Sequence, residues 1–129
     1  MSGGRTRALA TIQRSKDRHV RGSEVTAHGP RECVISGAAA ARLAEPDLLL
    51  AVGGSSTIDA TKLMLLCLRH GITQTDELDA YRGFSTSDAS LRPADESRWL
   101  RMVAVPTTLS AAEFTWFGGA YDARRRVKE

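Results

Sequence analysis

Residues 51–62 read AVGGSSTIDATK and combine two glycines with three hydroxyl residues, which are the residue types of a loop that binds an anion. Gly53 and Gly54 let the backbone approach a ligand where a Cβ would clash. If a helix begins directly after them, its unpaired backbone N–H groups and its dipole favour a phosphate. A tight strand-to-helix turn without a ligand would use the same residue types, so both interpretations stay open at this point.

The loop matches neither of the two commonest nucleotide-binding fingerprints. The dinucleotide pattern Gly-x-Gly-x-x-Gly is excluded because no glycine follows Gly54 in the loop. The phosphate loop of NTPases is excluded because Ala60 and Thr61 stand before Lys62, where that motif has its glycine. We expect Lys62 to lie about two turns into the helix and to point to solvent or towards a partner site.

The elements around the loop are those of an α/β fold. Five consecutive apolar residues at 48–52 predict a strand buried on both faces, as in a parallel sheet covered by helices. The alanine-rich stretch 31–44 predicts a preceding helix, with Pro30 at its first position and Pro46 ending it. Residues 102–105 predict a second short strand.

The helix after the loop is predicted to be amphipathic. Ser56 is its expected N-cap, with Asp59 as the capping-box partner, and Gly71 ends it. One face is predicted to carry Ile58, Thr61, Leu65 and Leu68, and the opposite face Asp59, Lys62 and Arg69. A short helical turn is predicted at 76–81. Strand, helix and returning strand form a right-handed βαβ unit, so the sequence predicts a partial Rossmann-like parallel sheet.

Composition sets the broad class of the chain. Its 129 residues make about one domain, its hydrophobic content of 42% is ordinary, and no apolar run nears the roughly 20 residues of a membrane span. Cys33 and Cys67 are too few for a disulfide framework and indicate two reduced thiols in a cytoplasmic protein.

The net charge of +3 is concentrated at the two ends of the chain. Residues 1–31 are basic and contain no Phe, Tyr or Trp, and a second basic run occupies 124–128. Nucleic-acid binding would need aromatic residues among the basic ones, and membrane binding an apolar-faced basic helix, so we expect neither partner. We predict a disordered basic arm at residues 1–23.

Two motifs in the right order give the chain a resemblance to a known family. The stretch DLLLAVGGSSTIDATK, residues 47–62, resembles the Gly-Gly-Gly-Ser-x-x-Asp-x-x-Lys signature of the iron-containing (group III) alcohol dehydrogenases. The stretch VAVPTTLSAAEFT, residues 103–115, resembles the strand, Pro-Thr-Thr and Glu-x-Thr of that family, with a spacing similar to the maleylacetate reductase branch. The resemblance covers residues 24–129. It implies an incomplete dinucleotide-binding α/β domain like the N-terminal domain that the family shares with dehydroquinate synthase.

The resemblance implies roles for residues of both motifs. Gly53, Gly54 and Ser55 match the glycine loop that holds the pyrophosphate of NAD or NADP, with Ser55 in place of the third glycine. The other implied cofactor-binding residues are Ser56, Asp59, Thr107, Thr108 and Leu109. A helix-cap role for Asp59 and a hydroxyl-capped turn at the two threonines stay open as structural alternatives. No role is implied for the motif positions Glu113 and Thr115.

Members of the family bind a divalent metal, Fe²⁺ or Zn²⁺, through an aspartate and histidines of a following helical domain. The metal polarises the alcohol or carbonyl oxygen while hydride passes to or from the nicotinamide. His19, His28 and His70 have no metal-ligand spacing, so we expect the chain to lack the metal ligands and the C-terminal helical domain. We therefore expect no activity from the chain alone.

Two hypotheses of different classes remain. In the first, the chain is the cofactor-binding part of a metal-dependent, NAD(P)-linked oxidoreductase of alcohols and carbonyls, or of a maleylacetate-type acid. A second chain or a longer reading frame would then supply the helical domain. In the second, the chain is a non-catalytic fragment that binds a nucleotide weakly or not at all. In either case an exposed sheet edge could pair with a second copy of the chain.

Overall fold

The computed structural model describes residues 8–14, 18–25, 29–83, 100–115 and 117–128 of the chain. Within these residues the elements are β1 (Ala8–Arg14), β2 (Arg18–Val25), α1 (Arg31–Ala44), β3 (Leu48–Gly53), α2 (Ser55–His70), η1 (Thr75–Tyr81), β4 (Arg101–Pro106), η4 (Ala112–Phe114), β5 (Tyr121–Asp122) and β6 (Val127–Lys128). The elements η1 and η4 are 3₁₀ helices, and η1 falls where the sequence predicted a short helical turn.

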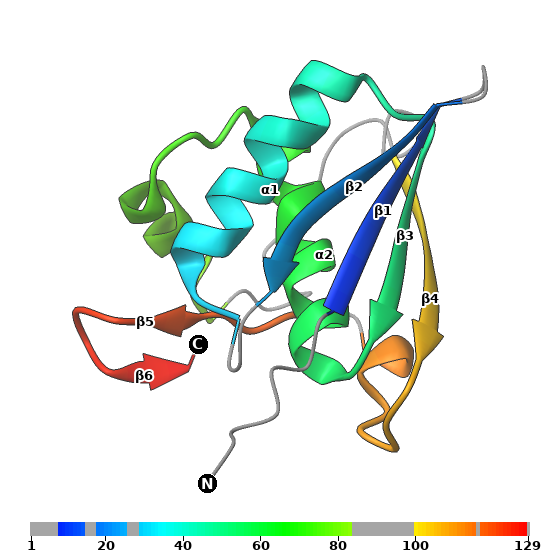
Figure 1. The fold of residues 1–129 in the computed structure, drawn as a ribbon. Coiled ribbons are helices and arrows are strands. Elements are labelled where there is room, and N and C mark those ends of the chain that lie inside the picture. The colour runs from blue at the N-terminus through cyan, green and yellow to red at the C-terminus, as the bar shows by residue number, and fades with distance from the viewer. Residues whose placement is uncertain (1–7, 15–17, 26–28, 84–99, 116, 129) are drawn as a thin grey trace, which may run out of the picture.

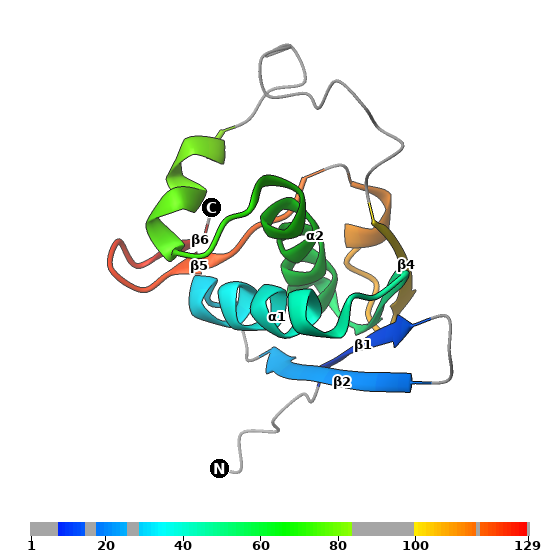
Figure 2. The ribbon, with the colours of Figure 1, turned by 90° about the horizontal axis from the view of Figure 1, so that it is seen from above.

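A four-stranded sheet with the order β2-β1-β3-β4 organises these elements. Strands β3 and β4 are parallel and in register from Leu48↔Arg101 to Gly53↔Pro106, with α2 between them in the chain. Strand β1 is antiparallel to both β2 and β3. Helices α1 and α2 lie on the same face of the sheet (Figures 1 and 2). The predicted βαβ unit is confirmed, and the fold is α/β.

The N-terminal segment corrects one prediction. Strands β1 and β2 lie largely within residues 1–23, for which the sequence predicted a disordered arm, and the expected domain boundary at 23/24 falls inside β2. The composition of a segment reports its side chains, whereas a sheet is joined through backbone N–H and C=O groups. Strand β1 pairs with β3 along Leu9↔Val52 to Gln13↔Leu48, so the edge of β3 is covered by the chain itself.

Strand β3 is buried on one face only, which corrects the prediction of burial on both. Its residues alternate between half-buried and buried, with Leu49, Ala51 and Gly53 on the buried side. On neighbouring β4, Val103 and Val105 are each 45% exposed. The difference arises because both described helices pack against the same face of the sheet (Figure 2).

The helix predicted over 31–44 is confirmed at both ends by α1. Pro30 is its N-cap rather than its first helical residue, and Glu45 follows it in the left-handed conformation. Pro46 then prevents the helix from continuing, as predicted. The acidic side chain of Glu32 lies in the first turn, where the helix dipole favours a negative charge.

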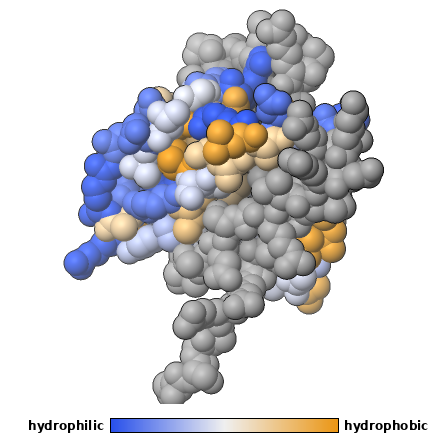
Figure 3. Space-filling view, turned by 45° about the horizontal axis from the view of Figure 1, so that its top comes forward, coloured by the Kyte–Doolittle hydropathy of each residue, from blue (hydrophilic) through white to orange (hydrophobic). Residues whose placement is uncertain are grey.

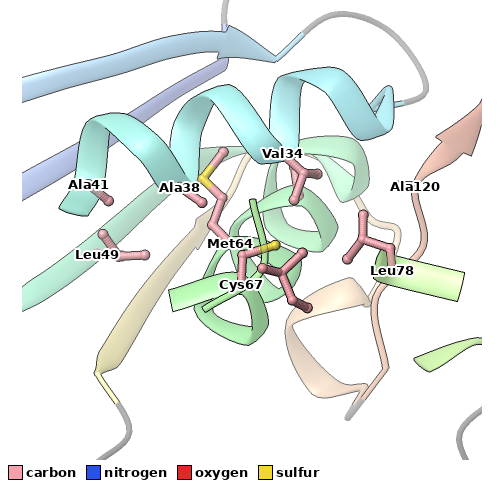
Figure 4. Packing of buried hydrophobic residues seen from close by; sticks show 10 residues of the cluster. Val34, Ala38, Ala41, Leu49, Met64, Cys67, Leu78 and Ala120 are labelled. Carbon is pink, nitrogen blue, oxygen red and sulfur yellow. The ribbon is translucent and has the colours of Figure 1, made fainter. Parts of the chain in front are cut away.

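The core is formed where α1 packs on α2 above β3. Figure 4 shows Val34 and Ala38 of α1 close to Met64 and Cys67 of α2, with Leu49 of β3 beside them. These side chains are at most 3% exposed. Small residues on α1 let the two helices approach closely, and full burial of a side chain such as that of Met64 contributes roughly 1.5–3 kcal/mol. Burial also raises the pKa of the Cys67 thiol to about 11, so this free cysteine is a core residue.

The C-terminus of α2 is held by α1 and by a glycine. The guanidinium of Arg42 donates to the carbonyl oxygens of Cys67 (2.8 Å) and Ile72 (2.5 Å). Gly71 is the C-cap, as predicted, and takes φ 69°, ψ 24°, the left-handed conformation that a Cβ disfavours. His70 is the last residue of the helix, and its ring lies 5.0 Å from that of Tyr81.

A group of ion pairs fastens the β5–β6 hairpin to η1 and to the start of α1. Arg31 is buried, and its guanidinium lies 2.7 Å from Asp79 and 3.5 Å from Asp122. Arg125 lies 2.8 Å from Asp79 and 3.4 Å from Asp122. On the face shown in Figure 3, hydrophilic residues gather on the left, the side on which Figure 1 places η1 and this hairpin.

We expect Gly71→Ala to lower the free energy of unfolding by about 1 kcal/mol, because a Cβ disfavours the left-handed conformation. Apart from the chain neighbours of Gly71, no described residue has an atom within 4 Å of the position that the new Cβ would take, so we assign the cost to the backbone. Urea unfolding measures the change. Gly71→Asn should cost less, since asparagine tolerates this conformation. Equal losses for Ala and Asn would contradict the backbone explanation.

Asp79 predicts a dependence of stability on pH. Hydrogen bonds from Arg125 and then from Arg31 hold the pKa of its carboxyl well below the usual 3.8. Because the pKa of Asp79 is lower in the folded state than in the unfolded state, these pairs stabilise the fold fully at a pH above the unfolded-state pKa. This stabilisation is lost as the pH falls through the folded-state pKa. Asp79→Asn should therefore lower the urea midpoint at pH 7, and its difference from wild type should shrink between about pH 5 and about pH 2.

The matched control for this prediction is Asp76→Asn. Asp76 pairs with Arg124, and both side chains are more than 60% exposed, so the loss of this pair should change stability little. A pH-independent difference between Asp79→Asn and wild type would contradict the role of the Asp79 ion pairs.

Candidate functional site

The glycine loop and the threonine pair meet at the carboxyl ends of β3 and β4. The backbone N–H of Thr107 donates to the carbonyl oxygen of Gly53 at 2.9 Å. Thr108 packs directly against Gly54: a Cβ on Gly54 would lie 3.1 Å from both Oγ1 and Cγ2 of Thr108. Four of the residues that the sequence singled out therefore lie side by side, although more than 50 residues separate Gly54 from Thr107 in the chain.

Helix α2 begins at this edge without a side-chain cap. Gly54 is the N-cap, in an extended conformation (φ −84°, ψ −165°), and the described residues form no side-chain hydrogen bond at this cap. The first helical bond runs from the N–H of Ile58 to the carbonyl oxygen of Gly54 at 3.1 Å. The N–H groups of residues 55–57 precede this bond, and these are the groups that a helix N-terminus offers to an anion.

Ser56 is therefore not the N-cap that the sequence predicted. It is the second residue of α2, and Ser55 is the first. The reason is that the extended Gly54 connects β3 to α2 in a single residue and leaves no residue outside the helix for a serine cap. Both serines are half-buried at the start of the helix, next to the edge formed by Gly54 and Thr108.

Asp59 lies elsewhere. It is only 9% exposed, although the sequence placed it on the polar face of α2. Its carboxylate is 3.3 Å from the ammonium of Lys128 on β6. The segment before β5 covers this side of the helix, since a Cβ on Gly118 would lie 3.0 Å from the carbonyl oxygen of Asp59. With Gly54 as the N-cap and Lys128 as the partner of this carboxylate, the capping-box role predicted for Asp59 is wrong.

Of the two orientations expected for Lys62, towards solvent or towards a partner site, the structure does not show the first. Its ammonium lies 2.6 Å from the carbonyl oxygen of Ala112, 2.7 Å from that of Thr115 and 2.9 Å from that of Phe117. The hydroxyl of Thr115 is a fourth partner at 2.9 Å. Burial lowers the pKa of Lys62, and the nearby carboxylates Asp59 and Glu113 oppose that shift. Sequence reasoning identified this lysine within the motif but missed its partners.

The remaining residues of the second motif differ in exposure. Leu109 is fully exposed, and both threonines of the pair are exposed as well. Ala112 is buried at 7% in a small cluster with Ala51 of β3 and Ile58 of α2. This cluster anchors η4 beneath the loop, which explains why a small apolar residue stands at position 112.

The described part of the chain offers neither a metal site nor a membrane span. No group of three His, Cys, Asp or Glu side chains there could hold a metal ion. Likewise, none of the described helices combines the length and the hydropathy that crossing a membrane requires. His28, like Trp99 and Trp116, lies outside the described residues.

The contact between Gly54 and Thr108 predicts a double-mutant coupling. Gly54→Ala should lower the free energy of unfolding by about 0.5–1.5 kcal/mol, because the new Cβ crowds Thr108 whereas the backbone angles of Gly54 suit any residue. Thr108→Ala removes both crowded atoms, so Gly54→Ala should cost less in that background. Urea unfolding of the four proteins in the cycle measures the coupling. The same cost in both backgrounds would contradict the contact.

Comparison with known proteins identifies the family. The family model of iron-containing alcohol dehydrogenases matches residues 2–129. The dehydrogenase ALT3 of Alternaria alternata is 33% identical over 96 residues, which cover 74% of this chain and 24% of that protein. The dehydrogenase FUM7 of Gibberella moniliformis (strain M3125 / FGSC 7600) is 31% identical over 111 residues, which cover 81% of this chain and 25% of that protein.

The chain thus spans about a quarter of the length of the curated relatives that it matches. The family match covers both motifs, and it includes the N-terminal strands, which lie largely before residue 24, where the resemblance seen in the sequence begins. The chain belongs to the iron-containing alcohol dehydrogenase family.

Proposed function

We propose that the edge formed by Gly53, Gly54, Thr107 and Thr108 binds the pyrophosphate of a nicotinamide dinucleotide, NAD or NADP. The observation that carries the proposal is the contact of Thr108 with Gly54 at the uncapped N-terminus of α2. Two loops from adjacent parallel strands meet there, which is where open α/β sheets bind their ligands.

The chemistry of this edge suits a phosphate. The N–H groups of residues 55–57 and the positive end of the helix dipole attract negative charge, contributing about 0.3–1 kcal/mol per charge at an exposed site. The exposed hydroxyls of Thr107 and Thr108 add donors that can rotate towards phosphate oxygens. Because Gly54 has no side chain, a ligand can approach the backbone closely at this point.

Ser55 and Ser56 complete the proposed site. They are the first two residues of α2, so their backbone N–H groups face the edge and their hydroxyls lie within the first turn. Asp59 is left out of the proposed site, because its carboxylate contacts Lys128. Leu109, fully exposed beyond the threonine pair, is proposed to lie against the nucleotide, where it would cover apolar surface of the cofactor.

At the level of the whole protein, the family supports oxidoreductase activity, and the two curated relatives are both named dehydrogenases. We infer a metal-dependent, reversible conversion of an alcohol and a carbonyl compound, or reduction of a maleylacetate-type acid. The bound nicotinamide would carry the hydride in either case. The described residues supply no metal site, so in this proposal the metal ligands come from other residues.

Titration of the full 129-residue chain with NADH tests the proposal. We expect saturable enhancement of NADH fluorescence with a dissociation constant in the micromolar range, about −8 kcal/mol, and competition by ADP-ribose, which carries the same pyrophosphate. Parallel titration with NADPH compares the two cofactors. Absence of saturable binding of either cofactor would overturn the proposal.

Gly54→Ala should weaken NADH binding about tenfold, because the new Cβ crowds Thr108 and narrows the approach to the backbone. Gly71→Ala is the matched control, since it makes the same substitution at the other end of α2. It should lower stability but leave the affinity within about twofold. Equal loss of affinity in both variants would contradict the placement of the pyrophosphate at Gly54.

A further inference from the structure

We propose that Lys62 is a positioning residue of the cofactor site: its ammonium fixes the backbone at Ala112, Thr115 and Phe117 and thereby holds the threonine pair, 107 and 108, against Gly53 and Gly54. The inference rests on the proposed function, because it assigns the lysine a purpose in cofactor binding. It also gives roles to two motif positions, Lys62 and Thr115, for which the sequence implied none.

The contacts of Lys62 converge on one segment. Three carbonyl oxygens, from Ala112, Thr115 and Phe117, lie 2.6–2.9 Å from its ammonium. All three acceptors lie more than 45 residues further along the chain than the lysine. Together with the Thr115 hydroxyl at 2.9 Å, they bring four oxygens within hydrogen-bonding distance of the ammonium. A surface lysine with one exposed ion pair would not need such an arrangement.

The Thr115 hydroxyl takes part in the hydrogen bonds around the Lys62 ammonium. An ammonium has three N–H donors, which is one fewer than the number of oxygens around it. The Thr115 hydroxyl lies 3.0 Å from the carbonyl oxygen of Ala112 and 3.2 Å from that of Phe117, so it can accept from Lys62 while donating to one of them. The hydroxyl therefore links the ammonium to the carbonyl oxygen of either Ala112 or Phe117. Valine has the same shape but could not do this.

Nearby negative charges favour a protonated ammonium and oppose the burial that lowers the pKa of Lys62. The charged groups that face it are Asp59, on its own helix, and Glu113, on η4. One carboxylate oxygen of Glu113 is buried and has no hydrogen-bond partner among the described residues, so its negative charge is available to Lys62 at longer range. Replacing the ammonium with an apolar group would leave three carbonyl oxygens without this donor, whereas Asp59 would keep Lys128 as its partner.

The fixed segment leads back to the threonine pair over a short distance. Residues 107–111 join two anchors: the Thr107 bond to Gly53 at one end and the Ala112 contact with Lys62 at the other. Ala111, just before the second anchor, has φ 59°, the left-handed conformation that non-glycine residues rarely adopt. A strained residue of this kind persists only where neighbouring contacts hold the backbone on both sides.

One rigid helix supplies both anchors. Helix α2 begins after Gly54, the residue that Thr108 contacts, and Lys62 lies eight residues further along, about 12 Å up the same helix. Because both ends of the 107–112 loop are tied to α2 or to the strand that precedes it, the threonine hydroxyls keep a fixed place relative to the helix N-terminus. Among the described residues, loss of the Lys62 anchor leaves the Thr107 bond, the contact of Thr108 with Gly54 and the small Ala112 cluster.

The test compares Lys62→Met with two controls in the full chain. Lys128→Met removes the same charge from a lysine of β6 whose ammonium pairs with Asp59, outside the proposed site. Leu78→Ala weakens the core without touching the site. We expect Lys62→Met to weaken NADH binding at least about tenfold, and each control to change it by less than about twofold. Leu78→Ala also shows how much affinity is lost through reduced stability alone.

A second measurement does not depend on the cofactor. In the protein without NADH, hydrogen exchange of the backbone amides at 107–115 should accelerate in Lys62→Met and stay unchanged in Lys128→Met. Thr115→Val, a smaller change, should give an intermediate effect on both exchange and affinity. Thr115→Val and Lys62→Arg keep the test possible if Lys62→Met does not fold.

The outcomes separate this inference from the proposed function. If the wild type binds NADH and Lys62→Met binds it equally well, the positioning role is overturned and the proposed function stands. If Lys128→Met weakens binding as much as Lys62→Met does, the effect is one of net charge and the inference is also overturned. If the wild-type chain binds no cofactor, the proposed function fails, and the inference fails with it.

Discussion

Parallel pairing of β3 with β4 determines where the two loops of the site lie. The register places Gly53 opposite Pro106, so both strands end at the same level of the sheet. The residues directly after the two strands must then meet. The single residue Gly54 leads into α2, and the backbone N–H of Thr107 donates a hydrogen bond to the carbonyl oxygen of Gly53. A shift of this register by one residue would move Thr108 off Gly54 and turn the buried side chains of β3 to the open face.

Helix α2 converts this edge into a site. Its inner face packs against α1 through Met64 and Cys67, which fixes the direction of its axis. Its N-terminus opens at the carboxyl ends of the strands, and its outer side holds the 112–117 segment through Lys62. Rigid packing on one side and a cation on the other therefore determine the position of the same few backbone N–H groups. In our proposal those groups are what the cofactor recognises.

The sequence predicted the main helices and strands better than the contacts that they make with distant parts of the chain. Both motif-bearing strands, both long helices and the C-cap at Gly71 were foreseen, because hydrophobic periodicity and the positions of proline and glycine are local signals. The N-terminal hairpin was not, because its strands are joined through backbone bonds to β3 that composition does not report. For the same reason the partners of Asp59 and Lys62 could not be inferred from α2 alone: both partners lie more than 45 residues away.

Among the described residues, several charged side chains pair with one another, whereas the start of α2 borders exposed hydroxyl groups. Arg31 is buried with Asp79 and Asp122, an arrangement that offsets the cost of burying its charge and fixes the C-terminal hairpin. Asp59 and Lys128 form a second such pair along α2. The N-terminus of α2 differs from these regions, since it carries no side-chain cap and borders exposed hydroxyls. Folding thus pairs the charges that flank the helix and leaves its first turn open, which is the condition that binding of an anionic group requires.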